Sequence, residues 1–148
     1  MAGVLELDLS QFQRVNNYIE KLELSNTKKQ QILKNIATLV VSQTDDRFEN
    51  KKGPDGKPWK AWSPKYAMKR VSGKSLLESE GYLRSGITYE LIGERQALVG
   101  STDIYGGTHQ YGNPKKNIPA RPYLGINEDN KQEIEEEIIA YLENMIAL

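Results

Sequence analysis

The sequence predicts an α+β fold in which helices pack on one face of a small antiparallel β-sheet, with a long N-terminal helical hairpin and a C-terminal helix. Three observations support this prediction. Alternating apolar and polar residues near the N-terminus and after residue 86 indicate strands. Apolar residues at helical spacing fill residues 12–48 and 128–146. The 148 residues contain no internal repeat and no low-complexity linker, which indicates one domain over 1–148.

The N-terminal third predicts a strand followed by two helices. Leu5, Leu7 and Leu9 alternate with polar residues, as in a half-buried strand. Ser10 stands where it can cap a first helix with Phe12 on its apolar stripe. Residues 25–27, "SNT", supply a break and a second cap. A long helix over roughly 28–48 follows, and its apolar stripe consists of Ile32, Leu33, Ile36, Leu39, Val40 and Phe48.

Turn-forming residues end the long helix. Pro54-Asp55-Gly56 predicts a turn, and Ser63 and Pro64 predict the N-cap and first residue of a short helix to about Arg70. A second short helical segment is expected to end at Gly86. The alternating run after it and "QALVGS", joined by "GER", predict a β-hairpin.

Asn127 is placed to cap the final helix. The buried stripe predicted for this helix consists of Ile134, Ile138, Leu142 and Ile146. Glu128 and Asp129 lie at its N-terminal end, where negative charge is favourable.

Composition narrows the classes of protein. Twenty basic and twenty acidic residues cancel, so no overall charge attracts the chain to nucleic acid or membrane. Cysteine is absent, which excludes disulfides and thiolate metal sites and fits a reducing compartment. The opening "MAGVLELDLS" lacks the features of a signal peptide, and no stretch approaches the ~18 apolar residues of a spanning helix. We therefore expect a soluble, cytoplasmic chain with no membrane contact.

The balanced total hides two charged segments. Residues 51–74 hold eight basic residues and one acid, a net of +7, and residues 128–148 hold seven acids and one lysine, a net of −6. Both segments can be ordinary solvated faces. Alternatively, the opposite charges meet, within the fold or between neighbouring copies.

The stretch "YGGTHQYGNPKKNIPARPYLGIN" contains the only histidine, His109. Catalysis has little support here, because the chain has no cysteine, no G-x-S-x-G motif and no second histidine for a zinc site. We expect the His109 imidazole and the Gln110 amide to pin the loop through hydrogen bonds. Pro119 and Pro122 should hold an extended segment that pairs at a sheet edge and aims Arg121 outward. The prediction is a rigid platform without catalytic residues, cofactor or metal.

The basic segment has two interpretations. Trp59, Trp62 and Tyr66 alternate with lysines that include Lys57, Lys60 and Lys65. Aromatic rings and lysines together can stack on bases and neutralise phosphates. The favoured interpretation is that the tryptophans anchor the loop in the core while the lysines stay solvated.

Four segments of the chain, in order, carry a resemblance to a known family. They are "RFENKKGPDGKPWKAWSP", "LLESEGYLRSGI", "ALVGSTDIYGGTHQYG" and "IPARPYLGIN", and they span roughly residues 45–127. In this order they resemble the phage virion morphogenesis family, which includes tail-completion proteins of temperate tailed phages. Glu80, Gly106 and Thr108 depart from the family pattern.

The resemblance implies a non-enzymatic phage or prophage protein that acts in tail completion or head-tail joining, through ring-like oligomerisation. Its implied partners are further copies, other virion proteins of the tail end or head-tail connector, and DNA contacted non-specifically in a lumen. It would act in the host bacterial cytoplasm during assembly and be retained in the virion or leave it. The implied signature positions, structural or interfacial in role, are His109, Gln110, Ile118, Pro119, Ala120, Arg121 and Pro122.

Two other classes remain as alternatives. A nucleic-acid-binding module would use the Trp/Lys segment, and its affinity would fall steeply with salt. A small hydrolase would place His109 at its centre and lose activity in His109→Ala.

Overall fold

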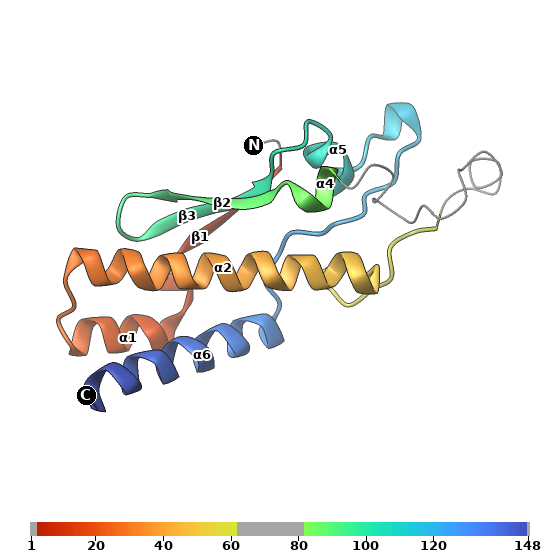
Figure 1. Ribbon diagram of the computed structural model, residues 1–148. Coiled ribbons are helices and arrows are strands. Elements are labelled where there is room, and N and C mark those ends of the chain that lie inside the picture. The colour runs from red at the N-terminus through yellow and green to blue at the C-terminus, as the bar shows by residue number, and fades with distance from the viewer. Residues whose placement is uncertain (1–2, 62–81, 148) are drawn as a thin grey trace. The chain divides into compact units, whose positions relative to one another are not determined.

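The computed structural model describes residues 3–61 and 82–147, and its elements follow the predicted order (Figure 1). These elements, in chain order, are β1 (Val4–Asp8), the 3-10 turn η1 (Leu9–Gln11), α1 (Gln13–Lys21), α2 (Asn26–Asn50), α4 (Tyr82–Ser85), β2 (Ile87–Ile92), β3 (Gln96–Ser101), α5 (Gly106–Tyr111), the 3-10 turn η2 (Pro114–Lys116) and α6 (Glu128–Ala147). The predicted α+β class is confirmed.

The sheet is antiparallel and has the strand order β1-β3-β2, so the central strand comes last in the sequence. Side chains of β2 alternate between half-buried and exposed, as the period-two pattern predicted. Ala97 and Val99 of β3 are fully buried. The predicted N-terminal strand and β-hairpin are both confirmed.

The described residues form two compact units. The clamp unit draws on the ranges 1–4, 44–88 and 100–125, and the helical unit on the ranges 5–43, 89–99 and 126–148. The division passes through α2 between Gln43 and Thr44.

In the helical unit, α1, α2 and α6 lie along one side of the sheet, and α1 and α2 run antiparallel (Figure 1). The predicted apolar stripes are largely buried, although Leu39 is only half-buried. Burial of each large side chain contributes roughly 1.5–3 kcal/mol. Fully buried members are Leu7, Leu9, Phe12, Val15, Ile19, Ile32, Leu33, Ile36, Val40, Ile134, Ile138 and Leu142.

Polar contacts fix α6 against its neighbours. Glu135 accepts a hydrogen bond from the Arg14 backbone N–H at 2.8 Å, and Glu143 accepts one from the Tyr18 hydroxyl at 3.1 Å. That bond raises the pKa of Tyr18. The Gln43 amide donates to the Asn130 carbonyl at 3.2 Å. These bonds set the register of α6 on both helices of the hairpin.

The predicted cap at Ser10 is wrong. Helix α1 begins after Phe12 without a side-chain cap. The Asp8 carboxylate instead accepts from the Ser10 backbone N–H at 2.9 Å, and the Gln11 side chain accepts from the Asp8 N–H. This reciprocal pair closes η1 two residues earlier, because a charged carboxylate is the stronger acceptor.

The other predicted helix starts and turns are confirmed where they are described. The Ser25 hydroxyl accepts from the Lys28 N–H at 3.3 Å, and Asn127 and Asn130 cap each other at the start of α6. Gly56 donates to the Gly53 carbonyl at 3.0 Å and so closes the predicted turn. The short helix predicted from Ser63 to Arg70, and the side chain of Ile146, lie outside the described residues.

Candidate interaction site

The segment from Ile118 to Gly125, "IPARPYLG", crosses the clamp unit outside the three strands and is held mainly by side chains. Its backbone N–H at Arg121 donates to the His109 carbonyl of α5 at 2.8 Å. The predicted pairing at a sheet edge is therefore wrong. Pro119 and Pro122 have no N–H to donate, so the segment cannot form a regular ladder.

An aromatic cluster supports this segment from one side. The Trp59 ring is buried, meets Phe48 edge to face with centroids 5.4 Å apart, and donates its Nε1–H to the Pro122 carbonyl at 2.7 Å. Tyr123 packs against Phe48 at 5.6 Å, and its hydroxyl donates to the Gly106 carbonyl at 2.9 Å. Burial raises the pKa of Tyr123. Trp59 is thus a core anchor, as the favoured interpretation held, and cannot stack on a base.

Arg47 of α2 supports the other end of the segment. Its guanidinium is buried and donates to the carbonyls of Tyr123 and Gly125, each at 2.8 Å. Burial lowers the pKa of Arg47, yet an arginine stays charged at neutral pH. Sequence reasoning missed this residue, because an arginine on a helix is by default a solvated one.

Arg121 points inward, contrary to the prediction. It is 7% exposed, and its Nε donates to the Lys60 carbonyl at 2.7 Å and its Nη2 to the Ala61 carbonyl at 3.3 Å. The buried loop carbonyls need donors, and a guanidinium supplies several in a fixed fork. Arg121 therefore ties the loop before residue 62 to the "IPARPYLG" segment.

The predicted role of the Gln110 amide is confirmed. Its Oε1 accepts from the backbone N–H groups of Tyr123 and Leu124, both at 3.0 Å, and its Nε2 donates to the Leu124 carbonyl at 3.2 Å. The side chain thus takes the place of a neighbouring strand. It locks α5 to the segment.

His109 supports the segment through its backbone carbonyl and not through the Nδ1 atom of its imidazole ring. Its Nδ1 is buried and has no hydrogen-bond partner within residues 3–61 and 82–147, so the predicted imidazole bonding is wrong at this nitrogen. Burial, and then the charge of Arg121, lower the pKa of His109. A neutral, half-buried ring with an idle Nδ1 lacks the oriented partner of a catalytic base.

Some residues of the predicted basic segment lie in the described part of the chain, and others lie outside it. Lys57 and Lys60 are described, and both are exposed. Trp62, Lys65 and Tyr66 lie outside the described residues.

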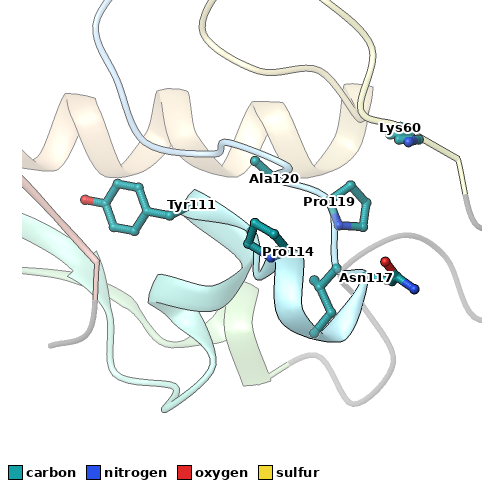
Figure 2. Close-up of a pocket in the computed structure, with 8 residues that line it drawn as sticks. Lys60, Tyr111, Pro114, Asn117, Pro119 and Ala120 are labelled. Atoms are coloured by element: carbon teal, nitrogen blue, oxygen red, sulfur yellow. The ribbon is translucent and has the colours of Figure 1, made fainter.

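Pro119 lines an open pocket of about 330 Å³ on the outside of the clamp unit. Figure 2 shows the rings of Tyr111, Pro114 and Pro119, with Lys60, Asn117 and Ala120 around them. Pro122 is not one of the residues that line the pocket. Its backbone carbonyl accepts the hydrogen bond from the Trp59 Nε1–H. The pocket wall mixes polar and apolar surface, and the pocket was not predicted from the sequence.

No cluster of three or more His, Cys, Asp or Glu residues suited to a metal ion occurs in the described parts of the chain. Among the helices that the structure describes, none combines the length and apolarity needed to cross a membrane.

The geometry defines a rigid platform that presents a loop surface, and comparison with known proteins gives its family. Residues 10–143 match the model of the phage virion morphogenesis family, and the chain belongs to this family. The resemblance seen in four ordered segments is thereby confirmed. Membership assigns the chain to the assembly of phage particles.

Relatives of the chain include proteins of phage Mu and of Mu-like prophages. The chain is 37% identical to "Putative capsid assembly protein G" of Escherichia phage Mu, over 73% of this chain and 76% of the relative. It is 27% identical to "Mu-like prophage FluMu G protein 2" of Haemophilus influenzae, over 97% and 99% of the two chains. No solved structure gives a significant match.

Proposed function

We propose that this chain is a non-enzymatic assembly protein that completes the phage tail or joins the tail to the head. It acts as a ring of identical copies that contacts other virion proteins at the tail end or connector. Both compact units serve this one role, as a single virion-morphogenesis domain over 1–148. The protein works in the cytoplasm of the host bacterium during assembly.

The observation that carries the proposal is the clamped "IPARPYLG" segment. Arg47, Trp59 and Gln110 direct their polar groups at its backbone carbonyls and N–H groups. The use of these three side chains as backbone supports favours a protein that presents a fixed surface to a partner.

The exposed Lys57 also suits weak contact with DNA that passes through the ring. Such contact would be independent of sequence and would weaken steeply with salt. It is an accessory property of the ring and not the main role.

Deletion of the gene from the phage or prophage that encodes it tests the proposal. The deletion should leave DNA-filled heads and separate tails that do not join, visible by electron microscopy, and the wild-type chain supplied from a plasmid should restore joined particles. An Arg121→Ala variant should restore few of them, whereas the exposed-site control Lys34→Ala should restore normal numbers. Normal joined particles in the deletion would contradict the proposal. Absence of heads altogether would move the role to capsid assembly.

A further inference from the structure

The loop that follows α5 presents two lysines on a stiff support. Asn113 and Ile118 exchange two backbone hydrogen bonds, at 2.7 and 3.0 Å, so residues 113–118 form a tight hairpin around η2. Lys115 and Lys116 lie at its tip, and both are exposed. Because the hairpin is short and bonded at its base, the backbone from which both flexible side chains extend is fixed.

An apolar surface lies beside these lysines. Tyr111 is 66% exposed, and Pro114 and Ala120 of the pocket wall are exposed as well. Figure 2 shows Tyr111 at the end of α5 and the rings of Pro114 and Pro119 on the chain that follows it. Proline loses no rotamer freedom when a partner covers it, so this surface can be buried at little entropic cost.

The described residues that line the pocket include Lys60 and no acidic residue. Lys115 and Lys116 lie in the sequence between Pro114 and Asn117, which both line it. We call Lys60, Lys115 and Lys116, with the pocket they flank, the basic rim. A partner that fits the basic rim carries several carboxylates on one rigid face.

The chain itself contains such a face. On α6, Ile134, Glu135, Ile138 and Ile139 are buried, whereas Asp129, Glu133, Glu136 and Glu137 are exposed on the outer side. Their spacing of four, three and one residues places them along one face of the helix. The structure gives these four carboxylates no ion pair with any residue it describes. Like charges four residues apart weaken a helix, so a partner that neutralises them would stabilise α6.

We propose that the basic rim of one copy binds the outer acidic face of α6 of a second copy. This inference rests on the proposed ring-forming function and names the two surfaces that would form its contact. The two surfaces are different, so the contact is head to tail, the type that closes into rings when its rotation allows. The lysines pair with the carboxylates, while Tyr111 and the prolines cover the aliphatic stems of the glutamates.

Reversing the charges of the basic rim and of the acidic face of α6 tests the proposed contact between copies. One variant carries Lys115→Glu and Lys116→Glu, a second carries Glu136→Lys and Glu137→Lys, and a third carries all four changes. A control carries Lys21→Glu and Lys34→Glu, which make the same charge change at exposed sites of α1 and α2. Circular dichroism and thermal melting establish that each variant is folded. Light scattering then gives the concentration at which half the chains are assembled.

We expect each two-site variant to need about tenfold higher concentration for assembly, as several lost ion pairs would require. The four-site variant should return to near the wild-type value, and the control should not differ from it. If folded variants assemble as the wild type does, the inference is wrong while the ring proposal stands. The inference is also wrong if the four-site variant is not rescued, or if the lysine variant loses only binding to a DNA duplex. If the wild type never assembles, both proposals fail.

Discussion

Arg47 and Arg121 carry out the same task on opposite ends of one loop segment. Each buries its guanidinium and donates to backbone carbonyls, at Tyr123 and Gly125 for the first and at Lys60 and Ala61 for the second. A buried carbonyl left without a donor costs about 1–3 kcal/mol. Two arginines thus supply donors to a loop segment that lies outside the three-stranded sheet.

Gly112 stands where the chain leaves α5 for the hairpin, with φ +76° and ψ 174°. Only glycine readily adopts this conformation, and an added Cβ would lie 2.7 Å from the Ala120 nitrogen. We expect Gly112→Ala to destabilise the fold by more than roughly 1–3 kcal/mol, since strain and overlap add. Urea unfolding measures the change.

Gly56→Ala is the matched control for this prediction. Gly56 also has a positive φ of +80°, but an added Cβ there meets nothing within 4 Å. The stability lost in Gly56→Ala should therefore reflect conformational strain alone and be clearly smaller than the loss in Gly112→Ala. Equal losses at the two glycines would show that the close approach to Ala120 is unimportant.

His109 should make stability depend on pH. Burial first and the Arg121 charge second lower its pKa in the folded chain, against the opposing charge of Asp103. As pH falls below about 6.5, the unfolded chain therefore binds a proton before the folded chain does. Stability present above that pH is lost as pH falls toward the lowered pKa.

The comparison of wild type with His109→Gln isolates this effect. Between about pH 7.5 and 5.5, where carboxylates stay ionised, the wild type should lose more stability than the variant. Denaturant unfolding at the two pH values gives both losses. Equal losses would mean that the folded chain protonates His109 as easily as the unfolded chain does.

At the residue scale, the sequence predicted which side chains bond to the loop better than it predicted where each side chain points. Trp59 as an anchor and Gln110 as a loop pin follow from what these side chains do among prolines and glycines. Arg121 was predicted to point outward, because no periodicity marks the inner side of a segment between two prolines. Arg47 was missed because its acceptors, the carbonyls of Tyr123 and Gly125, are distant in sequence.

At the scale of elements, the caps decide where helices begin. Asn127 accepts from the Asn130 N–H at 2.7 Å, and Asn130 accepts from the Asn127 N–H at 3.1 Å. Asn127→Ala should cost about 0.5–2 kcal/mol of stability, because it leaves a donor of the first turn unmet. Thermal unfolding measures it.

Ser25→Ala provides the comparison, since the Ser25 cap is longer, at 3.3 Å, and unreciprocated. It should cost less than Asn127→Ala. The reverse order would mean that the start of α6 is held by its packing on α1 and not by its cap.

The elements themselves were well predicted, and their ends less so. Helix α2 was expected over roughly 28–48 and extends from Asn26 to Asn50, because the apolar stripe marks only the buried turns. The start of α1 was misplaced, since Asp8 and Ser10 compete for the same cap and sequence does not show which backbone N–H each reaches. Tertiary contacts decide which side chain caps which backbone N–H.

At the scale of the whole molecule, the main feature is the pair of oppositely charged surfaces, the basic rim and the outer acidic face of α6. The chain has no net charge, yet Lys60, Lys115 and Lys116 are exposed in one region and four carboxylates are exposed along α6. Glu133 and Glu137 stand four residues apart on this face, a spacing at which like charges weaken a helix. A chain that assembles would gain orientation and speed of association from them.

The mass of the protein in solution tests the central claim, that the chain assembles with itself, most directly. Light scattering behind a sizing column, over a range of concentrations and at low and moderate salt, gives this mass. We predict a defined assembly several times the 16.8 kDa of one chain, which higher salt weakens because it screens exposed ion pairs. A mass of one chain at every concentration and salt would contradict self-assembly through these surfaces.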